Sequence, residues 1–171
     1  MKNSTILFLL FFCTTCTTYD NAIIYHKYFV SGTHPLLRFD GFYSDTTSDR
    51  SLVKKYKPVF FYKNGSSFSS ERYLIDTEIA AGASTNSLYG SWGNYLINAD
   101  TIQLEKFQLN ASNYERIILK GIISKDQIHW TSRKEHNETF KPVDYSIYFK
   151  SFSARPDSSK NFTRIKKKYN Q

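Results

Sequence analysis

The two cysteines of this 171-residue chain are its side chains best suited to covalent chemistry, and both lie near its start. Cys13 and Cys16 enclose two threonines and follow directly on an unbroken apolar run at residues 6–12. Residues 17–171 contain no cysteine, so no disulfide can cross-link the body of the chain. A secreted domain stapled by disulfides would carry its cysteines in the body of the chain, so the confinement of both to this leader region indicates another use.

The residues around the cysteines have the layout of an export signal. Lys2 supplies a positively charged start, residues 6–12 supply the apolar core, and small polar residues follow where cleavage is expected. The apolar run is much shorter than the roughly 20 residues that a membrane-spanning helix needs. The sequence therefore predicts export, with a signal peptide at residues 1–16.

A cysteine directly after such a run resembles the attachment site of bacterial lipoproteins, which are cut just before a cysteine that then carries acyl chains such as palmitate. Cys16, with the small Thr15 before it, is the first choice. Cys13 is the second choice, because cleavage before it would have to follow the bulky Phe12. The alternative is an ordinary signal peptide cut near residues 15–18. Several acyl chains would anchor the protein durably to a bacterial membrane, expected to be the outer membrane, whereas one chain binds only marginally.

The other reactive side chains form no recognisable catalytic motif. No serine lies in a Gly-x-Ser-x-Gly nucleophile motif. Asp40 and Glu105 would form an acid–base pair only if the fold brought them together, and a carboxylate between apolar strand residues more often pairs with an arginine, here Arg38. The i, i+4 spacing of a helical metal site is absent from the four histidines, which are His26, His34, His129 and His136. We therefore expect no enzymatic activity, no metal and no cofactor.

Composition favours a single domain rich in strands. Without the leader about 155 residues remain, which suits one domain with a core that needs no disulfide. The 13 tyrosines and 14 phenylalanines suit the half-buried surface of a sheet. The net charge of +8 favours anionic lipid, cell-wall polymer or an acidic partner over nucleic acid, given that the chain is expected to be exported.

Short apolar runs separated by turn signals predict about eight sequential strands. Asn64-Gly65 between two such runs is the strongest local hairpin signal, because a type I′ turn needs two residues of positive φ. Ile102 and Leu104 alternate with polar residues, as in a strand that is wet on one side. Loops are expected at residues 45–57, 79–89 and 134–142. The expected strands are residues 36–43, 58–63, 66–74, 91–97, 101–109, 114–124, 127–133 and 144–152.

Eight sequential antiparallel strands remove their exposed edges most simply by closing into an up-and-down β-barrel. We therefore predict an all-β fold with few or short helices; a two-sheet sandwich is the alternative. A barrel of about eight strands is wide enough to be filled by side chains or to hold one small ligand. The expected organisation is a signal peptide (1–16), a tether and uncertain segment (17–35), the barrel (36–155) and a basic tail (156–171).

Two stretches, LRFDGFY at residues 37–43 and WGNYLINADTI at residues 92–102, carry a family resemblance. Together with the leader and residues 152–158, they resemble small lipoproteins of Bacteroidetes-type bacteria. The order of the expected strands is similar to that of lipocalin-like, or calycin, barrels. The resemblance implies a barrel with a lumen and fixes no activity.

A ligand in such a lumen would contact inward-facing aromatic side chains. Polar groups at the mouth, such as Arg38 or Tyr43, would suit an apolar or amphipathic small molecule. The alternative is that the aromatic side chains only fill the core. The candidate lumen residues are Phe39, Phe61, Trp92, Tyr95, Trp130, Tyr145 and Phe149.

The predicted function is that of an exported lipoprotein, held at the cell envelope by its lipidated cysteine, whose barrel binds a small apolar ligand or an envelope protein. The alternative is a structural or assembly-interaction protein with a side-chain-filled barrel and no ligand. The basic cluster at residues 164–169 would gain about 1 kcal/mol per charge at an anionic membrane surface. The alternative is a solvated, frayed terminus. Nucleic-acid binding is not expected of an exported chain.

Overall fold

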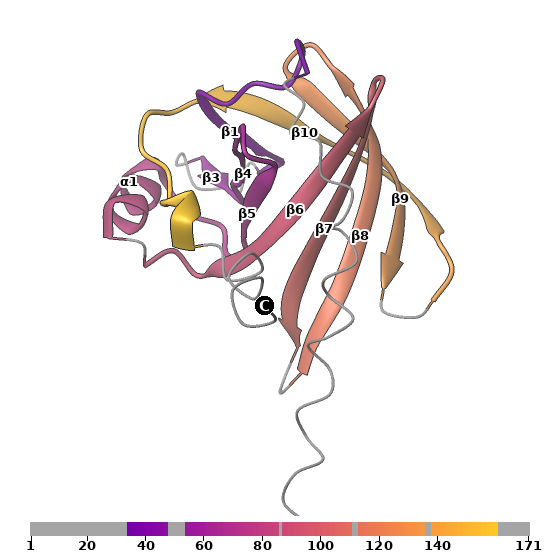
Figure 1. Ribbon diagram of the computed structural model, residues 1–171. Coiled ribbons are helices and arrows are strands. Elements are labelled where there is room, and N and C mark those ends of the chain that lie inside the picture. Colours follow the sequence, from indigo (N-terminus) through magenta and orange to yellow (C-terminus); the bar gives the residue numbers. More distant parts are fainter. Residues whose placement is uncertain (1–33, 48–53, 86, 111–112, 136–137, 161–171) are drawn as a thin grey trace, which may run out of the picture.

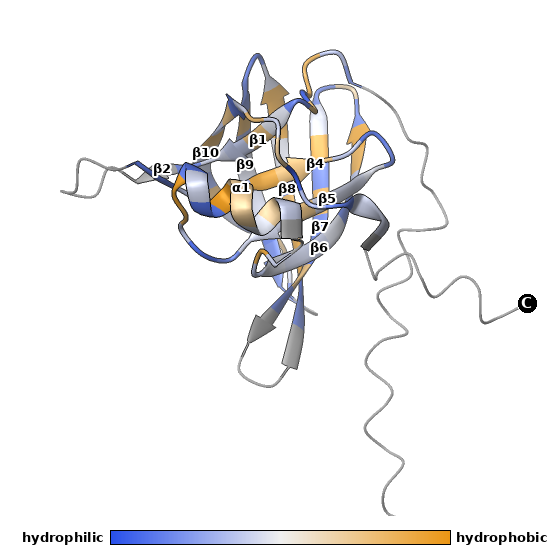
Figure 2. Cartoon of the chain, turned by 90° about the vertical axis from the view of Figure 1, so that its left-hand side faces the viewer, coloured by the Kyte–Doolittle hydropathy of each residue, from blue (hydrophilic) through white to orange (hydrophobic). Residues whose placement is uncertain are grey.

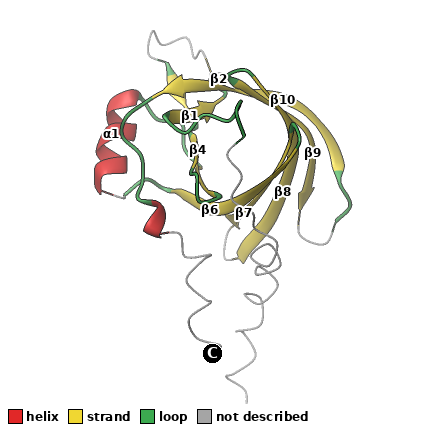
Figure 3. Cartoon of the chain, turned by 45° about the horizontal axis from the view of Figure 1, so that its top comes forward, coloured by secondary structure: helices red, strands yellow, loops and turns green. Residues whose placement is uncertain are grey.

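Eight antiparallel strands close into one barrel in the computed structural model of the chain (Figures 1 and 3). The structure describes residues 34–47, 54–85, 87–110, 113–135 and 138–160. Every barrel strand pairs with its neighbours in the sequence of barrel strands, so the predicted all-β up-and-down barrel is confirmed. In ring order the strands are β1 (Gly41–Ser44), β10 (Lys141–Ser151), β9 (Gln127–Glu135), β8 (Asn113–Ser124), β7 (Thr101–Asn110), β6 (Gly90–Asn98), β5 (Ser66–Ser70) and β4 (Val59–Phe61).

The described residues also form one α-helix, α1 (Asp76–Thr85), which lies outside the barrel wall (Figures 1 and 3). The expectation of a loop at residues 79–89 is therefore wrong for most of the segment. Alanine is the strongest helix former, and the Glu78 carboxylate accepts a hydrogen bond from the Ile75 backbone N–H at 2.8 Å, which is one half of a capping box. The acidic first turn, with Asp76 and Glu78, also complements the helix dipole.

Two smaller elements complete the fold. The expected loop at 45–57 contains a two-stranded ribbon, β2 (Thr46–Thr47) and β3 (Lys55–Tyr56), and a 3-10 turn, η2 (Ser158–Lys160), follows β10. The expected loop at 134–142 is shorter than predicted, because β9 extends to Glu135 and β10 begins at Lys141.

The predicted hairpins are confirmed, although their turns differ in detail. Gly65 between β4 and β5 has a φ of 78°, and its N–H donates to the Tyr62 carbonyl. Asn64 does not have positive φ, so the turn is not type I′; its side-chain oxygen instead accepts from the Ser66 N–H at 3.0 Å. The β6–β7 and β8–β9 turns are tight and have positive φ at Ala99 and Asp126.

Apolar side chains pack inside the barrel in what we call the lumen cluster. Its aromatic members meet edge to face: Tyr43 and Phe61 have ring centroids 5.7 Å apart, and Phe61 and Tyr95 5.1 Å apart. Each fully buried side chain of this size contributes on the order of 2 kcal/mol by leaving water. The cluster comprises Leu37, Tyr43, Phe61, Tyr95, Ile102, Leu104, Ile117, Leu119, Ile123, Ile128, Trp130 and Ile147.

A second core, the outer cluster, lies on the outside of the barrel wall beneath α1. Ile79 of the helix is completely buried in it, and Figure 2 shows α1 in front of the wall with the apolar strand β4 beside it. Strands β4 to β6 are therefore buried on both faces. The outer cluster comprises Phe42, Tyr56, Phe60, Tyr62, Phe68, Ile79 and Trp92.

One end of the barrel, the upper end in Figure 1, is closed by residues 34–40. This segment was expected to begin the first strand, but the strand starts only at Gly41. Leu37 enters the lumen cluster, while the Arg38 guanidinium stacks 3.9 Å above the Phe149 ring and bonds to the carboxylates of Asp40 and Asp126. We call this the closed end.

Candidate functional site

Five of the seven predicted lumen residues lie inside the barrel among the buried apolar side chains. Phe61, Tyr95 and Trp130 belong to the lumen cluster. Phe39 and Phe149 are partly buried against it, and both lie at the closed end. These positions make the five residues part of a packed core.

The other two predicted residues lie elsewhere. Tyr145 faces inward, since it pairs with Trp130, but it is 39% exposed. The prediction that Trp92 faces the lumen is wrong, because Trp92 packs in the outer cluster, 5.1 Å from the Phe68 ring. Side chains alternate along a strand, so the inward position of Tyr95 places Trp92 on the opposite face of β6. Both faces of β6 are buried, and hydrophobicity alone could not fix its phase.

The carboxylates considered for acid–base chemistry each have an arginine partner. The expected pairing of Asp40 with Arg38 is confirmed at 2.7 Å. Glu105 lies on the outer face of β7, where the Arg116 Nε donates to its carboxylate. Burial raises the pKa of Glu105 to about 7, and Arg116 opposes this shift. Neither carboxylate therefore faces the lumen as part of a catalytic pair.

Several predicted sites fall outside the described residues. These are the lipid-attachment candidates Cys13 and Cys16, the part of the predicted tether and uncertain segment (17–35) up to residue 33, and the basic cluster at 164–169. Within the described ranges, no cluster of three or more histidine, cysteine or carboxylate side chains is arranged to hold a metal ion. Nor does any helix in those ranges have the length and apolar character needed to cross a bilayer.

The second end of the barrel differs from the closed end in its inward-facing residues. We call it the open end only to distinguish it from the end that residues 34–40 close. One transverse row of paired residues runs from Ser67 on β5 through Gly93 on β6 to Lys106 on β7. Ser67 pairs on its other side with Phe61, and Lys106 lies two positions beyond Leu104. Phe61 and Leu104 belong to the lumen cluster, and cross-strand partners share a face, so the row faces the lumen.

Lys106 is the charged member of this row, and it is half-buried. Burial lowers the pKa of its ammonium to about 8. The nearby cations Lys57 and Arg133 lower the pKa further, and Glu71 opposes them. Among the residues that the structure describes, the Lys106 ammonium forms no hydrogen bond or ion pair.

Two serine hydroxyls accompany this lysine. Ser67 is 0% and Ser69 is 1% exposed, and neither Oγ finds a hydrogen-bond partner in the described part of the chain. Ser91, which pairs with Ser69, differs because its Oγ donates to a Glu71 carboxylate oxygen at 2.9 Å. A buried hydroxyl without a partner typically costs about 1–3 kcal/mol.

Gly93 brings the serine and the lysine of the row together. A Cβ at Gly93 would lie 3.0 Å from the Ser67 Oγ and 2.2 Å from the Glu105 backbone oxygen. Any other residue would therefore place a side chain between Ser67 and Lys106. The glycine leaves the Ser67 hydroxyl and the Lys106 side chain facing one interior region.

Arg133 and Glu135 face the same end from β9, because they pair with Leu119 and Ile117 of the lumen cluster. One Arg133 Nη bonds to the Glu135 carboxylate at 2.6 Å, whereas the buried Arg133 Nε has no partner within the described residues. We define the open-end site as Lys106, Ser67, Ser69, Arg133 and Glu71. Its cations and unpaired hydroxyls can bind an anionic or hydrogen-bonding group.

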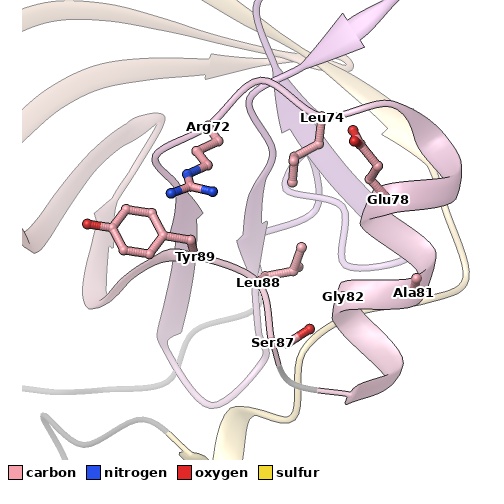
Figure 4. Close-up of a pocket in the computed structure, with 8 residues that line it drawn as sticks. All are labelled: Arg72, Leu74, Glu78, Ala81, Gly82, Ser87, Leu88 and Tyr89. Atoms are coloured by element: carbon pink, nitrogen blue, oxygen red, sulfur yellow. The ribbon is translucent and has the colours of Figure 1, made fainter.

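A separate shallow groove of about 380 Å³ lies outside the barrel beside α1 (Figure 4). The Arg72 guanidinium stacks on Tyr89 at 4.8 Å, and the Glu78 carboxylate is engaged by the start of the helix. Leu88 packs directly against Gly82, because a Cβ at Gly82 would lie only 2.5 Å from the Leu88 side chain. The groove therefore follows from the docking of the 87–89 segment on α1. It is lined by Arg72, Leu74, Glu78, Ala81, Gly82, Ser87, Leu88 and Tyr89.

Sequence reasoning missed the open-end site, although β7 carries a signal for it. The inward face of β7 runs from Ile102 to Leu104 and then to Lys106. A lysine that continues an apolar period-two face is the kind of local conflict that marks functional positions. Arg133 carries no such signal, because a bulge between Lys120 and Gly121 shifts the register between β8 and β9.

Comparison with known proteins yields no matching family model, and no significant match among curated proteins or solved structures. Any inference about function therefore rests on the chain itself, and above all on the barrel and its open end.

Proposed function

We propose that this chain is an exported lipoprotein, anchored to a bacterial envelope membrane through a lipidated Cys16, whose barrel binds a small ligand at its open end. The observation that carries the binding proposal is the row of Ser67, Gly93 and Lys106. It directs into the barrel an ammonium and a hydroxyl that have no partner among the described residues. The large majority of buried side-chain polar atoms in proteins have a hydrogen-bond partner. A bound molecule would supply the partner for the Ser67 hydroxyl and the Lys106 ammonium.

The packing of the lumen restricts where such a ligand binds. The closed end is occupied by edge-to-face aromatic side chains, with Tyr43 between Phe61 and Phe149. A deep apolar cavity is therefore not the binding region that we propose. The ligand instead binds among the polar groups of the open end, against the apolar residues of the lumen cluster.

A second candidate function is the binding of an envelope protein to the outside of a filled barrel. The packed closed end favours it, and so does a set of exposed apolar side chains on β8, on β10 and just before β10. Ile122 is 43%, Tyr148 53% and Phe140 40% exposed. This candidate requires no ligand in the lumen and leaves the polar open end unexplained, so we rank it second.

Native mass spectrometry of the full chain, extracted gently from its own membrane, tests both parts of the proposal. We expect a mature chain that begins at an acylated Cys16 and carries an additional non-covalent small molecule. The matched Cys16→Ser variant should lose the acyl mass. An unmodified mature chain that begins at residue 17 or 18 would refute the anchor, and a chain that never retains a small molecule would favour the second candidate.

A further inference from the structure

We propose that the open-end site recognises a single carboxylate group, held by the Lys106 ammonium and the hydroxyls of Ser67 and Ser69. This inference deepens the proposed function, on which it rests, by naming the chemistry of the ligand.

The geometry of the row supports contact of one small anion with both Lys106 and Ser67. The two residues are joined through Gly93, each being its cross-strand partner, and neighbouring strands lie about 4.8 Å apart. With no side chain at Gly93, the Ser67 Oγ lies above its backbone. A carboxylate over this glycine can accept a hydrogen bond from each side, and Ser69 lies two residues further along β5.

The charges of the open end favour one negative charge. The charges that act on Lys106 are those of Lys57, Arg133 and Glu71. Arg133 is paired with Glu135. Lys106 and Lys57 are then opposed by the single carboxylate of Glu71, which leaves one net positive charge. A monoanion neutralises it, whereas a dianion such as phosphate would leave an excess negative charge in a poorly solvated interior.

The surroundings of the row favour an aliphatic carboxylate. The row borders the lumen cluster on three strands, because Phe61 pairs with Ser67, Ile117 pairs with Lys106, and Leu104 precedes Lys106 on the same face. An alkyl chain attached to the carboxylate can pack on these apolar side chains. A free anion without an apolar part would leave that surface uncovered.

The test uses isothermal titration calorimetry on the full chain in lipid nanodiscs, with empty nanodiscs as the blank. Hexanoate is the probe. Hexanamide is its uncharged analogue, and inorganic phosphate is the control for a dianion. We expect saturable one-to-one binding of hexanoate, binding at least roughly tenfold weaker for hexanamide, and none for phosphate. Lys106→Met should weaken hexanoate binding at least roughly tenfold, while Lys120→Met, which removes an outward-facing lysine of β8 that stacks on Phe140, should not.

The pH dependence of affinity separates recognition from a structural role. Hexanoate affinity should fall by up to about tenfold per pH unit as Lys106 loses its proton above pH 8, and Lys106→Met should remove this dependence. Lys57, Arg133 and Glu71 act on the charge of Lys106, and Glu115 and Glu135 lie on the inward faces of β8 and β9 at this end. All five are present in both proteins. Ser67→Ala with Ser69→Ala should weaken binding severalfold and leave its pH dependence.

Three outcomes would overturn the carboxylate site. They are equal binding of hexanoate and hexanamide, unchanged affinity in the Lys106→Met protein, and absence of any binding at about 10 mM hexanoate. Each of these outcomes is compatible with a bound small molecule detected by native mass spectrometry. The carboxylate proposal can therefore fail while the proposed ligand-binding function stands. Thermal unfolding of the Lys106→Met protein, expected to occur at a temperature no lower than for the wild type, confirms that the variant folds.

Discussion

Lys106 is a residue that lowers the stability of the fold that contains it. Its position continues the inward apolar face of Ile102 and Leu104, and no described group pairs with its ammonium. Proteins retain such a destabilising charge where activity requires it, at a cost in stability. The cost should be visible in the pH dependence of unfolding.

The sign of that dependence follows from the pKa of Lys106, about 8 in the folded protein against 10.5 for an ordinary lysine. Between these values the unfolded chain binds more protons than the folded one. The free energy of unfolding should therefore rise with pH from 8 to 10.5, by up to about 1.4 kcal/mol per pH unit. Urea denaturation across this range should show a smaller rise in Lys106→Met. Parallel curves of unfolding free energy against pH for the wild type and Lys106→Met would show that Lys106 does not cause the rise.

Glu105 should produce the opposite slope at lower pH. Its pKa is raised from 4.5 to about 7 by burial, so between these values the folded protein binds more protons. This group's contribution to the free energy of unfolding is complete below pH 4.5 and is lost as pH rises through 7. In urea titrations Glu105→Gln should flatten the decline over that interval. Gln103→Ala, on the same strand, removes no titrating group and is the control, which should leave the slope unchanged.

At the scale of elements, hairpins were the features most directly predictable from sequence. The strands β6 to β9 lie where alternating and apolar runs placed them. The described β6–β7 and β8–β9 turns are short and polar, with a residue of positive φ in each. The helix α1 was missed because its residues 80–83, Ala-Ala-Gly-Ala, carry no apolar stripe. It is helical through alanine propensity and is held by one large apolar side chain, Ile79.

That dependence on Ile79 can be measured. Ile79→Ala should lower the free energy of unfolding by about 2–5 kcal/mol, because the side chain is fully buried in the outer cluster. Thr77→Ala, at an exposed position of the same helix, should change it by about 0.5 kcal/mol or less. Urea denaturation followed by tryptophan fluorescence suits the comparison, since Trp92 lies in the same cluster. Equal effects of the two substitutions would show that α1 is not held in this way.

The inward or outward phase of a strand could be predicted only where one face is wet. The residues of β4, Val59–Phe61, are apolar on both faces because the lumen lies on one side and α1 packs on the other. Hydrophobicity cannot then choose a phase. Trp92 was assigned to the wrong face for the same reason. The open-end site depends on register across three strands, which a single strand's pattern does not contain.

At the scale of the whole molecule, the two ends of the barrel interior differ in side-chain chemistry. The closed end consists of packed aromatic side chains under residues 34–40. The open end carries Lys106 and the hydroxyls of Ser67 and Ser69, which have no partner within the described residues. The fold class was predictable because strand number and connection length leave few alternatives to a closed ring. The division itself was not predictable, because it depends on which residues meet across the lumen.

The closing seam of the barrel joins its first strand to its last, with Gly41 opposite Ser151. Pairing between residues so distant in sequence forms late, because the entropy of the long intervening segment opposes closure. A ribosome must therefore finish nearly the whole barrel before the ring can close. For the exported chain that we propose, a barrel that has not yet closed could still pass unfolded through a narrow secretion channel.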